Sequence, residues 1–207
     1  MISAIVGLAA ATTGCGGGAA NTTTTAAGTT TTTVPPTTTA QATTATGPSA
    51  LQAEANAAAA GDIPDNQVFI LFANRSGRYS TKYPEGWAQR GSGRHVVFRD
   101  KNNIVRIEIV PARPTTAATI TRAIEQLRGA RLVARPTRLS LPAGRAFKVV
   151  YSTRSAANAV TGKRVTLVVD RYYLARNGRQ AIVDLGTPEG VDNVDAYRLM
   201  IESFRWR

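Results

Sequence analysis

Residues 165–185 read VTLVVDRYYLARNGRQAIVDL and contain the strongest short turn signal of the chain. Asn177-Gly178 separates two runs rich in β-branched and aromatic residues, Val165–Ala175 and Gln180–Leu185. A two-residue type I′ turn needs positive φ at both positions, which Asn and Gly tolerate best. The stretch therefore predicts an antiparallel hairpin, and with it a sheet that is mostly antiparallel.

Short strands are also predicted before this hairpin, where apolar or alternating segments end at turns. These segments are Val68–Phe72, Tyr79–Tyr83, Val96–Arg99, Ile104–Val110, Thr137–Leu141 and Ala146–Thr153. The intervening turns are predicted at Lys101-Asn102-Asn103 and Pro142-Ala143-Gly144. In the clearest alternation, Val105, Ile107 and Ile109 face one side of the sheet, and Arg106 and Glu108 face the other. Such a strand has one face on the core and one in solvent.

Two helices complete the pattern. The first has an apolar stripe with helical spacing, a Thr that can cap its start and a Gly that can end it. Its stripe is Ile120, Ala123, Ile124 and Leu127, its cap Thr115 or Thr116, and its end Gly129. The second begins near Asp192 or Asn193 and places Val194, Tyr197, Ile201 and Phe204 on one face. The order of elements predicts an α+β fold: a central, mostly antiparallel sheet of about six to seven strands, with helices packed against it.

Residues 79–87 carry a family resemblance. Tyr79-Ser80-Thr81-Lys82-Tyr83-Pro84-Glu85-Gly86-Trp87 resembles the opening motif of PsbP-like domains, a strand ending in Tyr-Pro, a Gly turn and a Trp. The ending Met200-Ile201-Glu202-Ser203-Phe204-Arg205-Trp206 is similar to the closing segment of that family. The resemblance covers about residues 69–207. It implies an antiparallel sheet sandwiched by helices, and it brings no functional residue with it.

The motif has an ordinary physical interpretation. Tyr83 and Trp87 are large rings on either side of a Pro84 and Gly86 turn. We expect both rings to pack the sheet against a helix. The alternative is that they stack on a ligand.

The N-terminus predicts export and a lipid anchor. Ile2–Ala11 is an apolar run that is too short to span a membrane but suits a signal peptide. Cys15 follows it and is the only cysteine of the chain. The pattern resembles a bacterial lipoprotein signal over residues 1–15, with Cys15 as the lipidation site. Two features depart from that signal, because Thr12 replaces the usual aliphatic residue and no Lys or Arg precedes the apolar run.

Residues 16–61 predict a disordered tether before a globular domain at 62–207. Fifteen threonines fall within residues 22–46, and no apolar face exists at the period of a helix or of a strand. Nothing there offsets the entropy of ordering the chain. Threonine-rich tracts of this kind are linkers and potential O-glycosylation stalks.

The globular part is strongly basic. All 25 Lys and Arg lie after Gly61, against 12 Asp and Glu, which leaves a formal charge of +13 on residues 62–207. Of the basic residues 21 are Arg, which suits bidentate contacts to phosphate and carboxylate. Two explanations stay open: attraction to an anionic surface, or the codon usage of a GC-rich genome.

The sequence offers no catalytic or cofactor motif, so we expect a protein that is not an enzyme and has no cofactor. The chain has one histidine, His95, and one cysteine. These are too few ligands for a Cys/His metal site. No serine lies in a Gly-x-Ser-x-Gly elbow. The densest acidic group, Asp184, Glu189, Asp192 and Asp195, lacks the spacing of a calcium loop.

These features predict a monomeric, extracytoplasmic lipoprotein held at the cell membrane by Cys15. We expect it to present its basic domain to an envelope protein partner. An anionic membrane surface or an acidic wall polymer is the alternative ligand. Nucleic acid is not expected, because the basic residues are not interleaved with aromatics and the chain is predicted to be exported.

Overall fold

The computed structural model describes residues 60–157 and 162–207. Cys15, the predicted signal over 1–15 and the predicted tether up to residue 59 lie outside the described residues. Within the described part, no helix is long and apolar enough to cross a membrane.

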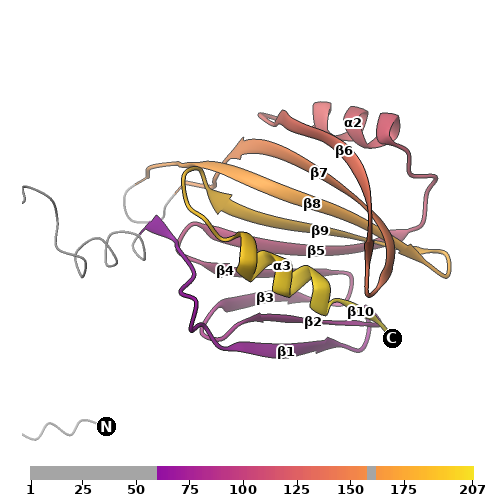
Figure 1. Cartoon of the computed structure of the whole chain (residues 1–207), viewed down its shortest axis with the longest axis horizontal. Helices are drawn as coiled ribbons and strands as arrows, with labels where there is room; N and C mark the ends of the chain where they lie inside the picture. Colours follow the sequence, from indigo (N-terminus) through magenta and orange to yellow (C-terminus); the bar gives the residue numbers. More distant parts are fainter. Residues whose placement is uncertain (1–59, 158–161) are drawn as a thin grey trace, which may run out of the picture. The chain divides into compact units, whose positions relative to one another are not determined.

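A seven-stranded sheet forms the centre of the fold (Figure 1). Every neighbouring pair in it is antiparallel. In spatial order its strands are β3 (Ala88–Ser92), β4 (His95–Asp100), β5 (Asn103–Pro111), β9 (Arg179–Pro188), β8 (Thr166–Arg176), β7 (Gly144–Arg154) and β6 (Arg131–Leu141). The predicted α+β class with a mostly antiparallel sheet is therefore confirmed.

Tight turns fix the register of two hairpins, β8–β9 and β4–β5. Asn177 and Gly178 have φ of 48° and 72°, as a type I′ turn requires, and they place Arg176 opposite Arg179. Lys101, with φ 49°, lies in the turn between β4 and β5. These turns are where the sequence predicted them.

A second, three-stranded sheet lies beside the first. It consists of β1 (Phe69–Asn74), β2 (Tyr79–Pro84) and the short β10 (Arg205–Trp206), with β2 in the middle. Helix α3 (Val194–Ser203) packs against β2. The Ser203 hydroxyl accepts a hydrogen bond from the Lys82 amide at 2.7 Å, which joins the end of the helix to the strand.

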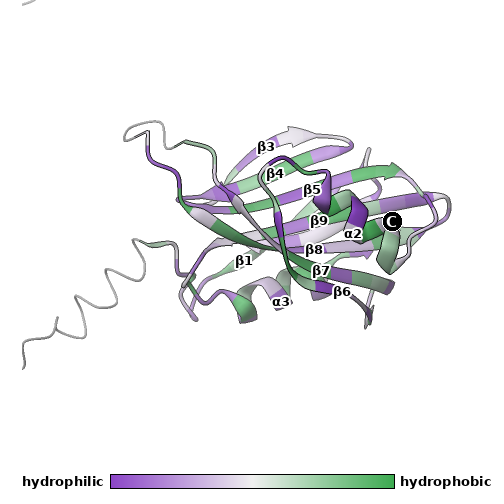
Figure 2. Cartoon of the chain, turned by 90° about the horizontal axis from the view of Figure 1, so that it is seen from above, coloured by the Kyte–Doolittle hydropathy of each residue, from purple (hydrophilic) through white to green (hydrophobic). Residues whose placement is uncertain are grey.

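The large core lies between α3, the small sheet and one face of the large sheet, which we call the α3 face. Val105, Ile107 and Ile109 project into it from β5, as the alternation predicted. From α3 come Tyr197, Met200 and Ile201. Figure 2 shows the alternation of hydrophilic and hydrophobic residues along the strands that produces this two-sided sheet.

A smaller core lies on the opposite face, under helix α2 (Ala117–Glu125). Ile120 and Ile124 are its buried helical residues, and they join Val149, Tyr151 and Val169 of the sheet. Thr116 caps the helix in a reciprocal pair with Thr119. The helix packs mainly on β6 and to a lesser extent on β7, so it covers only part of this face.

The structure differs from the sequence-based expectations in four places. Val194, expected on one face of the last helix with Tyr197, Ile201 and Phe204, is 69% exposed, because it is the first residue of α3 and lies outside the large core. The strand β3 was not predicted, because all five of its residues are exposed and none forms an apolar alternation. The strand β6 begins at Arg131 and not near Thr137, since its first half is exposed and carries register shifts around Ala134. Helix α2 ends at Glu125, one turn before Gly129, although Leu127 still packs on the smaller core.

The residues of the opening motif lie at the junction of the two sheets. Pro84 is the last residue of β2, and Gly86 has φ 87° in the following turn. Trp87 is buried in the large core. Tyr83 stacks on Phe98 of β4, with their ring centroids 4.2 Å apart.

Candidate anion-binding groove on the open sheet face

The face of the large sheet opposite α3, which we call the open face, carries a cluster of arginines where α2 does not cover it. Arg90 on β3 is opposite Val97 on β4, which in turn is opposite Arg106 on β5. Arg90 and Arg106 are therefore two strands apart, about 10 Å between their backbones. Arg99 lies two residues beyond Val97 on β4 and is opposite Ile104. The backbone positions of the three arginines thus form the corners of a small triangle on the sheet.

These arginines line a groove of about 700 Å³. Its apolar lining comes from Val97, Ile104, Leu167 and Val169. We call this site the arginine groove and define it by Arg90, Arg99 and Arg106 together with those four residues. A cationic rim over an apolar floor can hold an anionic group and an apolar group of one partner at the same time.

The end of β7 and the residue after it form another wall of the groove. Thr153, Arg154 and Ser155 line it. The Arg154 guanidinium donates to the carbonyl of Arg164 at 3.1 Å, and the Arg164 guanidinium donates to the carbonyl of Ser155 at 2.8 Å. These reciprocal hydrogen bonds hold the wall against the chain that leads into β8.

The rim arginines are available to an external ligand. Arg90, Arg99 and Arg106 are exposed. Over residues 60–157 and 162–207 the ion pairs found are Lys148–Asp170, Arg171–Asp184 and Arg198–Asp195, and none of them uses a rim arginine. Asp100 is the one acidic residue among the described residues that line the groove.

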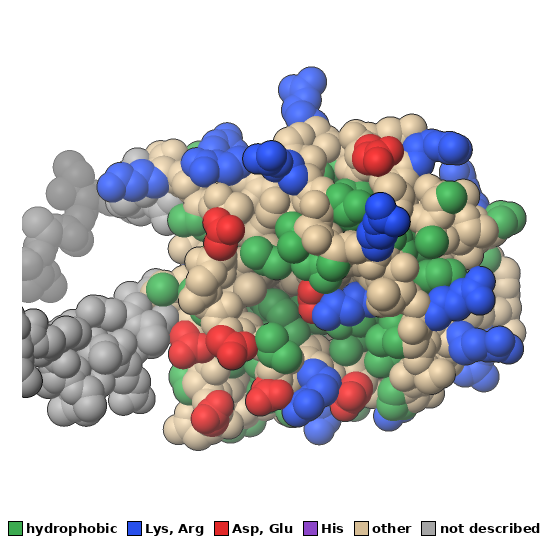
Figure 3. Space-filling model, turned by 45° about the horizontal axis from the view of Figure 1, so that its top comes forward, with side chains coloured by type: hydrophobic (Ala, Val, Ile, Leu, Met, Phe, Trp, Pro, Cys, Tyr) green, Lys and Arg blue, Asp and Glu red, His purple; other side chains and the backbone are tan. Residues whose placement is uncertain are grey.

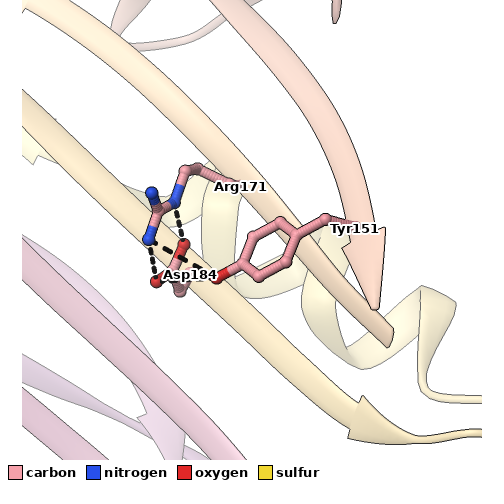
Figure 4. Close-up of polar contacts among 3 residues, drawn as sticks. All are labelled: Tyr151, Arg171 and Asp184. Atoms are coloured by element: carbon pink, nitrogen blue, oxygen red, sulfur yellow. Dashed lines mark hydrogen bonds and ion pairs between the residues drawn. The ribbon is translucent and has the colours of Figure 1, made fainter. Parts of the chain in front are cut away.

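A buried ion pair adjoins the groove in the same cross-strand row (Figure 4). Asp184 of β9 lies between Arg106 of β5 and Arg171 of β8. Arg171 binds Asp184 with two hydrogen bonds, 2.6 Å from Nε to Oδ1 and 2.8 Å from Nη2 to Oδ2. The Tyr151 hydroxyl donates to Asp184 Oδ2 at 3.4 Å, and the Arg171 guanidinium lies 5.2 Å from the Tyr151 ring centre. Asp184 forms its ion pair with Arg171, and among the described residues no ion pair joins it to Arg106.

Burial and charge fix the protonation of this cluster. Burial, reinforced by the negative charge of Asp184, raises the pKa of Tyr151 to about 12. Burial alone would lower the pKa of Arg171, but its hydrogen bonds and charge interaction with Asp184 outweigh that effect and raise the pKa. Tyr151 is therefore neutral and Arg171 charged at neutral pH. A fully paired cluster of this kind is a structural element of the sheet.

The residues considered for catalysis or metal binding are dispersed. His95 is exposed on β4, opposite Glu108. The acidic group noted in the sequence is divided, because Asp184 is paired under the open face while Asp192 and Asp195 lie near the start of α3. Among the described residues, no three His, Cys, Asp or Glu side chains are placed to hold a metal ion.

Charge is unevenly distributed over the surface. On the face drawn in Figure 3, basic side chains gather along the upper and right margins, and acidic side chains gather at the lower left. Four aspartates, Asp62, Asp65, Asp192 and Asp195, line one cavity of about 530 Å³. The basic excess of the domain therefore coexists with an acidic region at the start of α3.

The sequence analysis found the basic excess of residues 62–207 but missed both the arginine groove and the buried ion pair. The turns contain the missing signal, since a hairpin turn sets the register of both strands. Pairing Arg176 with Arg179 across Asn177-Gly178 places Arg171 opposite Asp184. The β3–β4 and β4–β5 turns place Arg90, Val97 and Arg106 in one row in the same way.

Comparison with known proteins gives similarities of fold. No protein-family model and no curated protein matches the sequence. Cyanobacterial PsbP (CyanoP) from Synechocystis is similar over 71% of this chain and 98% of its own, at 18% identity and a TM-score of 0.49. The Ran-binding protein Mog1p of Saccharomyces cerevisiae is similar over 67% and 95%, at 10% identity and 0.46. LpqN of Mycobacterium tuberculosis, involved in cell envelope biogenesis, is similar over 68% and 85%, at 14% identity and 0.37.

A PsbP structure thus stands among the matches, in agreement with the resemblance of residues 79–87. The matches are similarities of fold, and they do not indicate what the groove binds. The description of the groove therefore rests on the side chains of this chain alone, three exposed arginines around an apolar floor.

Proposed function

We propose that this protein is a non-catalytic binding module of the cell envelope and that its arginine groove docks an acidic surface of a protein partner. One observation carries the proposal: Arg90, Arg99 and Arg106 converge on an apolar floor and make no ion pair within the described residues. Arginine is enriched in protein interfaces because its planar group forms several hydrogen bonds while its stem packs on apolar surface.

The apolar floor favours a protein partner over a polyanion. Val97, Ile104, Leu167 and Val169 offer nothing to a phosphate chain, but they suit a partner that alternates acidic and apolar side chains. The cell-envelope location and the lipid anchor are supported by the apolar run before Cys15 and by the threonine-rich segment after it.

The test compares two triple variants with equal charge. The first, Arg90→Gln/Arg99→Gln/Arg106→Gln, removes the rim of the groove. The second, Arg75→Gln/Arg128→Gln/Arg176→Gln, removes three exposed arginines elsewhere. A photo-reactive residue at Ala88, which lines the groove, reports contact with a partner in the native envelope.

We expect the groove variant to lose the crosslinked partner and the control variant to retain it. A central interface arginine contributes about 2 kcal/mol, or roughly a thirtyfold change in affinity. Equal crosslinking by both variants, or no crosslinked protein in either, would reject docking at the groove.

The second candidate is electrostatic binding to an anionic membrane surface or wall polymer. The excess of 25 basic over 12 acidic residues after Gly61, spread over nearly every element, favours it. In that case both triple variants weaken binding to anionic vesicles or wall polymer by the same factor. Binding should also vanish near 0.5 M salt, where the screening length is about 4 Å.

The anchor has a separate test. Cys15→Ser removes the thiol that would receive the lipid, so the protein should pass from the membrane fraction to the medium. Ala88→Ser, which leaves Cys15 intact, is the control. A Cys15→Ser protein that stays in the membrane fraction would show that lipid on this residue does not hold it.

A further inference from the structure

A second basic cavity lies at the other end of the open face, apart from the arginine groove. It measures about 520 Å³ and is framed by the ends of β6, β7, β8 and β9 and by the segment before α2. We call it the hairpin pocket and define it by Arg113, Arg138, Arg145, Phe147, Tyr173 and Gln180. It shares no residue with the arginine groove.

Three arginines reach this pocket from three different elements. Arg138 comes from β6, Arg145 from β7, and Arg113 from the segment that follows β5. No acidic side chain is among the described residues that line the pocket, and none of the three arginines takes part in an ion pair within the described ranges. Three like charges around one small cavity repel each other until an anion enters.

The pocket is held in shape by hydrogen bonds beneath it. The buried Gln180 side chain donates to the Thr115 hydroxyl at 2.6 Å, and that hydroxyl donates to the Arg113 carbonyl at 2.9 Å. The Ala112 amide donates to the Gly178 carbonyl at 2.8 Å. The segment that carries Arg113 is therefore fixed to the β8–β9 hairpin.

One wall of the pocket is aromatic. The Arg138 guanidinium lies 5.3 Å from the ring centre of Phe147, which orients that cation at the edge of the cavity. Tyr173, largely buried, lies on the neighbouring strand β8 opposite Phe147. Ala146 and Ala175 contribute small side chains, which leave room for a flat group.

We propose that the hairpin pocket binds a small organic anion, in which a carboxylate or phosphate is attached to an aromatic group. Arg138, Arg145 and Arg113 bind the acidic group, and Phe147 and Tyr173 contact the ring. The volume falls within the range of small-molecule sites, and the combination of apolar walls with a few converging polar groups is what such sites share. This inference goes beyond the proposed docking function and does not depend on it.

The test uses 2-naphthoate, its neutral analogue 2-naphthamide and inorganic phosphate as probes. Each is titrated into the full-length chain by calorimetry at low salt. We expect naphthoate to bind at least about tenfold more tightly than naphthamide, because only the anion forms charge-assisted hydrogen bonds with arginine. Naphthoate should also bind more tightly than inorganic phosphate, which has no ring for Phe147 and Tyr173.

Two variants assign the binding to this pocket. Arg138→Gln/Arg145→Gln should weaken naphthoate binding about tenfold or more, whereas Arg75→Gln/Arg128→Gln, which removes the same charge elsewhere, should not. These side chains are exposed, so thermal unfolding should show that both variants fold as the parent does.

Several results would overturn the inference: naphthoate fails to bind, naphthamide or phosphate binds as tightly, or the two double variants behave alike. The groove variant Arg90→Gln/Arg99→Gln/Arg106→Gln separates this inference from the proposed function. It should leave naphthoate binding unchanged, and a loss there would place the anion in the arginine groove and reject the hairpin pocket.

Discussion

The two faces of the seven-stranded sheet are built from the same strands but are covered very differently. The α3 face lies under a helix and a second sheet, and its core includes the stacked rings of Tyr79 and Phe204. The open face lies under the single nine-residue helix α2, which packs mainly on the β6 side. On β5, for example, the open face carries Arg106 between Ile104 and Glu108, whereas the α3 face carries Val105, Ile107 and Ile109. The α3 face holds the larger core, whereas the part of the open face that α2 leaves uncovered is available for binding.

The largest expected loss of stability comes from removing a buried ring from the core on the α3 face. Phe204→Ala removes a ring that is 1% exposed, stacked 5.3 Å from Tyr79 and packed edge-on against Trp206. We expect the free energy of unfolding to fall by about 4 kcal/mol, since a large buried side chain leaves a cavity. Urea denaturation measures the loss. Val194→Ala on the same helix, at a side chain 69% exposed, should change stability little, and equal losses would contradict the comparison.

The buried ion pair is a polar element through which the open face is expected to contribute to stability, in addition to the smaller core under α2. Asp184→Asn leaves Arg171, whose side chain is only 14% exposed, without its counter-charge. We expect a loss of about 3 kcal/mol in the free energy of unfolding, because a buried charge without a partner is costly. Asp195→Asn breaks the exposed pair with Arg198 and should cost less than about 0.5 kcal/mol. A small loss at Asp184 would show that water reaches Arg171.

Tyr151 makes stability depend on alkaline pH. Its folded pKa of about 12 exceeds the value near 10 of an unfolded tyrosine. Its contribution is therefore complete below pH 10 and is lost as the pH rises through 12, because the unfolded chain releases the proton first. Between pH 9 and pH 12 we expect the free energy of unfolding of Tyr151→Phe to fall by about 2 kcal/mol less than that of the parent. Parallel pH profiles for the parent and the variant would contradict the assignment.

The smallest effect is expected at the arginine groove itself. Arg90→Gln/Arg99→Gln/Arg106→Gln changes exposed side chains that make no ion pair within the described residues, so stability should stay within about 0.5 kcal/mol. Relief of repulsion among three cations would even raise the unfolding midpoint slightly. A loss above about 1.5 kcal/mol would show that the arginines support the fold and are not simply available for binding.

Features set by neighbouring residues were predicted well. Asn177-Gly178 fixed one hairpin, and Thr116 was one of two proposed caps of α2. The pairing of β5 with β9 was not predictable in this way, because the chain between them forms α2 and three further strands. The strand β3 has no apolar pattern and takes its place from pairing with β4. Arg90 of the arginine groove lies on β3, so it could not be joined to Arg99 and Arg106 before that strand was known.

Asn193, the residue that precedes α3, ties the first described residues of the chain to the large sheet. Its side chain accepts a hydrogen bond from the Ile63 amide at 2.8 Å and donates to the Gly61 carbonyl at 3.1 Å and to the Thr187 hydroxyl at 2.7 Å. Asn103 of β5 donates to the same Gly61 carbonyl. The chain at residues 61–63 is thus joined through two amide side chains to β5 and β9, which are adjacent at the centre of the large sheet, and a load applied before residue 60 would reach these strands through them. The same chain continues into β1, an edge strand of the small sheet, so these hydrogen bonds tie it to the centre of the large sheet before it reaches that edge.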